Sequence, residues 1–190
     1  LAPEEEETGF APIVQGPEFL RRNSLDGFST IYMINVAELE RDAVKPLEEF
    51  VAKGGGLAWF VGNQVKPDFY TETLYGAKGA GEAPRLFPVP LEASSRNLRR
   101  DAVAADVADV KLDLHPVFAC LFEGQDNPFS ELIRVFQYYP ANRRYAYVDS
   151  DGEPAEDATG EVIRWDADDN VRKDGVETIA TLRNGAPLVL

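Results

Sequence analysis

Histidine and cysteine are almost absent from this chain of 190 residues, which contains one of each, His115 and Cys120. One cysteine excludes an internal disulfide and a zinc site built from several cysteines. One histidine excludes a metal site built from three histidines. A single thiol is compatible with a reducing compartment, and equally with an extracytoplasmic domain that uses no disulfides. We therefore expect no metal centre built from several histidines or cysteines. We also predict no cofactor.

Positive charge is also scarce, because 19 lysines and arginines face 33 aspartates and glutamates, giving a net charge of -14. This balance argues against a nucleic-acid partner, since little on the chain would neutralise phosphates, and we predict none. It also disfavours docking on an anionic lipid surface. No apolar run approaches the roughly 20 residues that span a bilayer. We expect this part of the protein to be soluble, with no direct membrane insertion.

The two ends of the sequence differ in character. Residues 1–9 contain the run Glu4–Glu7 and predict a disordered acidic tail. The last residues, Pro187–Leu190, are apolar and typical of a strand. Natural termini are more often polar, and the chain starts without an initiator methionine or signal peptide. We therefore expect a domain that is truncated at one or both ends, with any anchor outside this window.

The pattern strand, helix, glycine turn, strand occupies the centre of the first half. The apolar run Ile31–Val36 predicts a strand covered on both faces. Helical spacing follows over residues 37–53, and Pro46 inside it predicts a helix that begins near Asp42 or Val44.

The helix is expected to stop at Gly54–Gly56, because glycine accepts the left-handed conformation after a last turn. A second apolar strand follows over Leu57–Val61. About twenty residues separate the two strands, which suits a parallel crossover and an α/β fold.

The second half is rich in strand signals. Leu132–Tyr139 and Glu177–Arg183 read as strands, and Asn184-Gly185 is a hairpin signal. We predict one α/β domain over residues 10–190, with a strand-rich insertion around 92–180.

Polar residues follow both strands of the first half, at the edge where open parallel sheets bind their ligands. We therefore predict a ligand site at the strand ends. The candidate binding residues are Asn35, Val36, Gly62, Asn63 and Gln64.

A polar loop near the C-terminus has a partial calcium-binding pattern. Its oxygen ligands at positions 1, 3, 5, 9 and 12 are Asp166, Asp168, Asn170, Asp174 and Glu177. Position 6 is Val171, where the sharp turn needs glycine, and the flanks read as strands instead of helices. A solvated hairpin loop is the alternative, and we predict no metal site here.

His115 and Cys120 are residue types that often take part in catalysis. His115 lies among apolar residues, which favours a structural, hydrogen-bonded histidine, with a general base as the alternative. Cys120 lies in an apolar context, which favours a buried and inert thiol. A catalytic pair of the two is disfavoured, because neither lies on a strand-to-helix elbow.

The central unit resembles the class I glutamine amidotransferase-like fold, in which the second strand ends in Gly-x-Cys-x-Gly-x-Gln. Gly62 and Gln64 match the last glycine and the glutamine. The nucleophilic cysteine falls on Phe60 and the first glycine on Ala58. The resemblance implies a flavodoxin-like parallel sheet with helices on both faces. A phenyl ring cannot attack a carbonyl, and the downstream histidine–glutamate pair has no counterpart, so we expect no amidotransferase activity.

A narrower likeness depends on the order of six short motifs, Asn35-Val36, Gly54–Gly56, Phe87-Pro88-Val89, His115-Pro116, Pro128-Phe129 and Val135-Phe136. This order resembles that of large membrane-anchored proteins of planctomycete-type bacteria, which join a von Willebrand factor A-like domain to an amidotransferase-like domain. The Asp-x-Ser-x-Ser metal motif of A-domains is absent from this chain.

These resemblances imply a non-catalytic binding or assembly module in an extracytoplasmic, membrane-anchored protein. Its partners would be other domains of the same polypeptide or a separate protein. One alternative is a hydrolase that uses His115 with acidic partners. Another is a small-molecule or sugar sensor, provided that Trp59, Tyr70 and Tyr75 are exposed for stacking instead of buried in the core.

Overall fold

The computed structural model of the chain describes residues 11–76, 86–98, 108–112, 115, 116, 118, 133–141 and 178–189. The chain divides into two compact units, Leu1–Gln64 and Val65–Leu190, and each is described by itself. The predicted acidic tail over residues 1–9 lies outside the described residues. The prediction of one domain over residues 10–190 stays a prediction.

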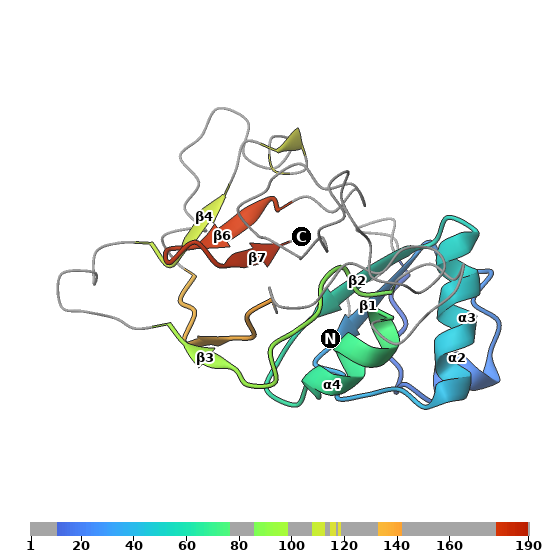
Figure 1. Cartoon of the computed structure of the whole chain (residues 1–190). Coiled ribbons are helices and arrows are strands. Elements are labelled where there is room, and N and C mark those ends of the chain that lie inside the picture. The colour runs from blue at the N-terminus through green and yellow to red at the C-terminus, as the bar shows by residue number, and fades with distance from the viewer. Residues whose placement is uncertain are drawn as a thin grey trace, which may run out of the picture. The chain divides into compact units, whose positions relative to one another are not determined.

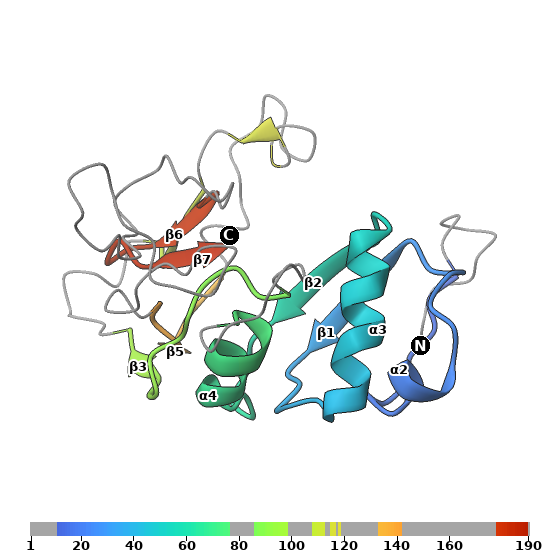
Figure 2. The ribbon, with the colours of Figure 1, turned by 45° about the vertical axis from the view of Figure 1, so that its right-hand side comes forward.

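The first unit is built on two parallel strands joined through a helix. Strand β1 (Thr30–Ile34) pairs with strand β2 (Gly56–Phe60), with Thr30 opposite Gly56 and Ile34 opposite Phe60. Helix α3 (Arg41–Ala52) connects them, and both views show it lying along the sheet (Figure 1 and Figure 2). The predicted strand–helix–strand order is therefore confirmed.

Helix α3 begins one residue before Asp42, close to its predicted start, and contains Pro46. Its buried face faces the core of the unit and consists of Ala43, Val44, Leu47 and Phe50.

The helix ends where the glycines were expected to stop it. Gly54 has a φ of 92°, a left-handed conformation that glycine adopts without steric cost. At the opposite end, the short helix α2 (Phe19–Arg22) packs beside α3, and its Arg21 forms ion pairs with Glu40 and Asp42. A short-range glycine signal therefore ends α3, whereas ion pairs over about twenty residues join α2 to its start.

The prediction that the first strand is covered on both faces is wrong for the described residues. Met33 is buried, whereas Tyr32 is 63% exposed and Ile34 is 70% exposed. Successive side chains of a strand point to opposite faces, so Met33 and Tyr32 face opposite ways. An apolar run without alternation indicates two apolar faces, but it does not show that something packs on both.

The second unit begins with a short helical segment. Helix α4 (Pro67–Phe69) continues into one π-helical turn, η1 (Tyr70–Leu74), and Pro67 lies in the first turn, where its missing N–H costs nothing. Tyr70 is 1% exposed, and its ring meets that of Phe87 edge-on at 5.0 Å between centroids. This contact joins the helical segment to the irregular segment around Phe87.

Two antiparallel sheets complete the described part of the second unit. Strand β3 (Arg96–Asn97) pairs with β5 (Gln137–Tyr138). The other sheet has the order β4-β6-β7 (Figure 1). Its strands are β4 (Val110–Leu112), β6 (Ala180–Leu182) and β7 (Pro187–Val189).

The hairpin signal at Asn184-Gly185 is confirmed, because it connects the antiparallel strands β6 and β7. Gly185 has a φ of 79°, which is where a turn needs glycine. The strand predicted over Glu177–Arg183 is shorter than expected and covers Ala180–Leu182 among the described residues.

The strand predicted over Leu132–Tyr139 is wrong for most of its described length, since only Gln137–Tyr138 is a strand. The backbone N–H of Val135 donates instead to the side chain of Asp109, at 2.9 Å. A partner 26 positions away therefore takes the place of a neighbouring strand.

The described fold is a mixed α/β structure with one two-stranded parallel sheet and two antiparallel sheets. A larger, flavodoxin-like sheet is not seen within the described residues. None of the helices in the described ranges has the length and apolar character needed to cross a bilayer.

Candidate functional site at the ends of strands β1 and β2

Asn35 is the residue around which the predicted strand-end site is organised. It directly follows β1 and has a φ of 50°, which is the left-handed region that side-chain-bearing residues rarely adopt. Its backbone N–H donates to the carbonyl of Phe60 at 2.8 Å, which extends the pairing of the two strands by one residue. Asparagine tolerates this conformation better than most residues.

The side chain of Asn35 bridges to the loop that follows β2. Its Oδ1 accepts a hydrogen bond from the backbone N–H of Gln64 at 3.0 Å. Its Nδ2 donates to Oδ1 of Asn63 at 3.1 Å. Gly62 lies against the same amide, because a β-carbon at position 62 would approach Asn35 closer than 3.0 Å. The structure therefore brings together four of the five predicted residues, and the fifth, Val36, is the next residue along the chain.

The surface next to this bridge combines amides with apolar groups. The side chains of Asn63 and Gln64 belong to exposed residues. Phe60 is 55% exposed and Val61 is 45% exposed. None of the five predicted residues, nor Phe60, titrates near neutral pH. The arrangement can therefore bind through hydrogen bonds and apolar contact, but it supplies neither a nucleophile nor a general base.

Phe60 is the last residue of β2, at the position where the resemblance places a catalytic cysteine. Its ring lies 6.2 Å from that of Tyr32 on the neighbouring strand, measured between centroids. A nucleophile elbow is a sharp, strained turn. Among the described residues, Asn35 is the only one other than glycine with a positive φ, so Phe60 does not have a left-handed backbone.

The other predicted catalytic and metal residues are only partly described. His115 is half-buried, and its carbonyl accepts a hydrogen bond from the backbone N–H of Phe118 at 2.9 Å. Cys120 and the partial calcium loop over residues 166–177 lie outside the described residues. Within the described ranges, no three histidine, cysteine, aspartate or glutamate side chains come together as a metal site would require.

Two of the aromatic residues considered for sugar stacking are buried. Tyr70 and Tyr75 are each 1% exposed, which confirms that these two are core residues and excludes their stacking on a ligand. Burial raises the pKa of Tyr70 to about 12, because the charged phenolate loses its hydration. Trp59 is half-buried within β2. These side chains belong to the packing of their units.

The sequence reasoning missed two groups of residues. Tyr32 and Ile34 flank the strand-end site on the exposed face of β1, and strand alternation was the signal that could have singled them out. A polar network in the second unit was also missed, although the sequence predicts one of its members, Asn184, as a turn residue.

No protein-family model, no curated protein and no solved structure matches the chain. The resemblance to class I glutamine amidotransferases therefore stays a prediction from the sequence.

Proposed function

We propose that the chain is a non-catalytic, amidotransferase-like binding or assembly module of a larger membrane-anchored bacterial protein, on its extracytoplasmic side. One observation carries this proposal. An exposed phenyl ring, that of Phe60, ends strand β2 where the family would place its reactive thiol. A side chain that cannot form a covalent intermediate, but can anchor an apolar contact, favours binding over catalysis.

The polar half of the site supports the same conclusion. Asn35 uses its amide to hold the loop at Gln64 and Asn63, so this amide stabilises the site instead of reacting. A residue kept at a φ of 50° must be held there by its surroundings. The strand ends are therefore a preformed surface, which reduces the entropy lost on binding.

The apolar half of the site indicates the kind of partner. Residues opposite each other in adjacent strands share a face of the sheet. The face that includes Phe60 carries no charged side chain, in a chain whose residues are 27% charged. It is formed by Thr30, Tyr32 and Ile34 of β1 and by Gly56, Ala58 and Phe60 of β2.

Uncharged faces with aromatic residues are typical of the centres of protein–protein interfaces. The partner proposed is therefore another domain of the same polypeptide or a separate protein, which would place apolar side chains against Tyr32 and Phe60.

The proposal extends to the fold. Strand β1, helix α3 and strand β2 form one parallel strand–helix–strand unit, which is the repeating element of flavodoxin-like sheets. Such sheets are covered on both faces. In this proposal the partner is the second covering layer, because it packs on the exposed face of Tyr32 and Ile34.

Two experiments test the function. Purified protein incubated with glutamine is expected to release no ammonia, and release would contradict a non-catalytic role. A photoreactive phenylalanine analogue at position 60 of the protein, in the cells that make it, is expected to crosslink one defined partner. The same analogue at Glu49, an exposed position on α3, is the matched control.

The crosslink at position 60 is expected to disappear when Ile34 is replaced by lysine, because a charge would be buried on the uncharged face. Equal crosslinking from positions 60 and 49, or a crosslink unaffected by Ile34→Lys, would count against the proposed surface.

A further inference from the structure

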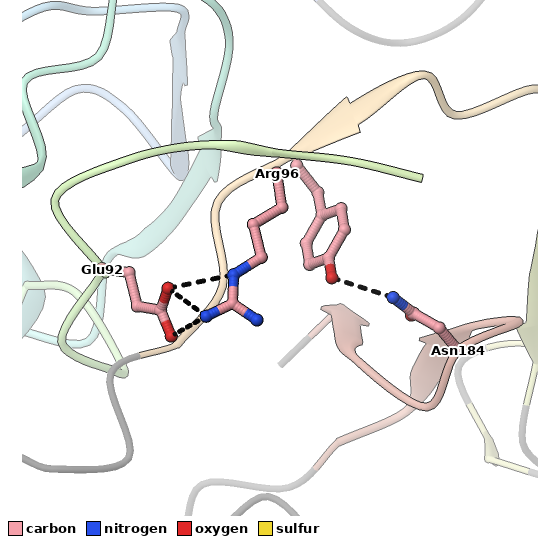
Figure 3. A network of polar contacts seen from close by, with 4 residues as sticks. Glu92, Arg96 and Asn184 are labelled. Atoms are coloured by element: carbon pink, nitrogen blue, oxygen red, sulfur yellow. Dashed lines mark hydrogen bonds and ion pairs between the residues drawn. The ribbon is translucent and has the colours of Figure 1, made fainter. Parts of the chain in front are cut away.

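A second polar cluster lies in the other unit, where strands β3 and β5 meet the hairpin turn between β6 and β7 (Figure 3). Arg96 of β3 and Tyr138 of β5 are cross-strand partners, so their side chains leave the ribbon on the same face. Glu92 accepts hydrogen bonds from Arg96, and Asn184 donates one to Tyr138. Both contacts appear as dashed lines in Figure 3.

The guanidinium of Arg96 is fixed in one orientation by Glu92. Its Nε donates to Oε2 of Glu92 at 3.1 Å. Its Nη2 donates to Oε1 at 2.8 Å and to Oε2 at 2.6 Å. Such a two-pronged pair adds geometric definition to the charge. The two N–H groups of Nη1 have no partner among the described residues, and the Arg96 side chain is 59% exposed.

The hydroxyl of Tyr138 is positioned by the packing of its ring and by one hydrogen bond. Its ring packs against the core cluster of Leu98, Val110 and Leu182. Its oxygen accepts a hydrogen bond from Nδ2 of Asn184 at 2.8 Å, which leaves the phenolic proton free to be donated. Asn184 is itself held by the turn, because its Oδ1 accepts from the backbone N–H of Ala186 at 3.2 Å.

The charges of this cluster decide which ligands suit it. Glu92 and Arg96 cancel, so a free anion would meet the carboxylate as well as the guanidinium, on a protein with a net charge of -14. A free cation would be repelled by the guanidinium. A neutral ligand avoids both repulsions. It would find fixed donors at Nη1, the phenol and the second N–H of Nδ2, and acceptor lone pairs on the carboxylate.

We propose that Glu92, Arg96, Tyr138 and Asn184 form a binding site for a neutral sugar. Adjacent sugar hydroxyls each donate and accept, which matches a surface that presents donors and a carboxylate side by side. The side chains are held before the ligand arrives, so little rotamer entropy is lost on binding. The site shares no residue with the strand-end surface, so either proposal can fail without the other.

The test is a titration of the full chain, labelled with ¹⁵N, by glucose, cellobiose and N-acetylglucosamine in turn. At least one sugar is expected to produce saturable shifts of the Arg96 Nε–H and Asn184 side-chain amide signals. Inorganic phosphate is the anionic probe and is expected to bind more weakly than that sugar.

Two variants and one control make the test specific. Arg96→Met and Tyr138→Phe are each expected to weaken sugar binding about tenfold, which corresponds to a loss of about 1.4 kcal/mol. Tyr138→Phe keeps the packed ring, so it tests the hydroxyl without disturbing the core cluster. Lys111→Met, at an exposed position on β4 of the same unit, is expected to bind like the parent.

Three results would overturn the proposal. The first is the absence of saturable shifts with all three sugars. The second is unchanged binding in both Arg96→Met and Tyr138→Phe, and the third is tighter binding of phosphate than of any sugar.

Discussion

The amide of Asn35 occupies the space that a β-carbon at position 62 would need, since such an atom would come closer than 3.0 Å to the amide oxygen. The amide is held there by Gln64 and Asn63. Position 62 is therefore restricted to glycine by a neighbour, and the loop after β2 depends on a side chain that follows β1. The predicted ligand residues are thus also the residues that fix the strand ends.

Replacing Gly62 by alanine is expected to destabilise the first unit by about 1–3 kcal/mol, as overpacking usually does. The new methyl group would displace the amide of Asn35 and break its hydrogen bonds. Urea unfolding followed by tryptophan fluorescence measures the effect, because Trp59 lies in β2.

Gly27→Ala is the matched control for Gly62→Ala. Nothing lies within 4 Å of a β-carbon at position 27, and its φ is not left-handed. This exchange is expected to stabilise the protein by about 0.4–1 kcal/mol, because alanine restricts the unfolded chain. Similar effects of the two exchanges would refute the steric account.

Replacing Asn35 tests the left-handed backbone separately from the hydrogen bonds. Asn35→Ala loses both side-chain hydrogen bonds, each worth about 1 kcal/mol, and places alanine at a φ of 50°. Asn35→Gly loses the same bonds but fits the conformation. We expect the glycine variant to be more stable than the alanine variant by about 1–2 kcal/mol in the same unfolding measurement. Equal stability would mean that the backbone relaxes at this position.

The first unit was largely readable from the sequence because its signals are local. The apolar runs, the helical spacing and the glycines at 54–56 each act within a few residues. The carboxyl ends of parallel strands meet at one edge, so Asn35 and Asn63 could be expected to be neighbours. The direction of the Asn35 amide could not be predicted. It depends on the left-handed backbone of Asn35, which asparagine can adopt but does not require.

The second unit was harder to read because its contacts join residues far apart in the chain. Val135 donates to Asp109 instead of to a strand neighbour, which interrupts an otherwise typical strand sequence. The network of Glu92, Arg96, Tyr138 and Asn184 gathers residues from three separate segments. The pattern of residues along the chain does not reveal such long-range contacts. The Asn184-Gly185 turn depends on adjacent residues and was predicted correctly.

The ion pair between Lys53 and Asp26 predicts how stability in the first unit responds to pH. Nζ of Lys53 lies 2.8 Å from Oδ1 of Asp26. The hydrogen bond from Lys53, followed by that from Ser24, lowers the pKa of Asp26 below its usual 3.8. The hydrogen bond to Asp26 raises the pKa of Lys53 above its usual 10.5.

The two shifts act at opposite ends of the pH scale. The contribution of Asp26 is present above its unfolded pKa and is lost as the pH falls through its lowered folded pKa. That of Lys53 is present below 10.5 and is lost as the pH rises through its raised pKa. Between these limits, the contribution of the ion pair to the free energy of unfolding is therefore expected to be independent of pH.

Lys53→Met is expected to return the pKa of Asp26 towards 3.8, because the largest cause of its lowering is removed. Titration of the ¹³C carboxyl signal of Asp26 measures this shift. Lys45→Met removes an exposed cation from α3 that has no ion pair among the described residues, and should leave the titration unchanged. An Asp26 titration that is the same in Lys53→Met and the parent would show that the ion pair does not persist in solution.

The pair of Asp109 and Arg183 predicts the largest stability effect in the second unit. Asp109 is 2% exposed, and its Oδ1 lies 3.6 Å from Nε of Arg183, whose side chain is 10% exposed. Its Oδ2 accepts from the N–H of Val135, and its carbonyl accepts from the N–H of Arg183. One residue therefore joins the segment before β4 to the chain before β5 and to the end of β6.

Asp109→Asn keeps the shape of the side chain but removes the negative charge beside a buried guanidinium. We expect a loss of about 3–5 kcal/mol, the usual result of breaking a buried ion pair from one side. Because the chain has two units, hydrogen exchange of the β4, β6 and β7 amides is the measurement of choice. These amides should lose protection while those of β1 and β2 keep theirs.

Glu92→Gln is the control for Asp109→Asn, since it also removes an arginine partner, but one at the surface. Exposed pairs contribute about 0–1 kcal/mol, so amide protection in β4, β6 and β7 should hardly change. If Asp109→Asn behaves like Glu92→Gln, the charge at position 109 does not hold the β4-β6-β7 sheet to its neighbours. In that case the core cluster of Leu98, Val110 and Leu182 would hold the sheet by apolar packing alone.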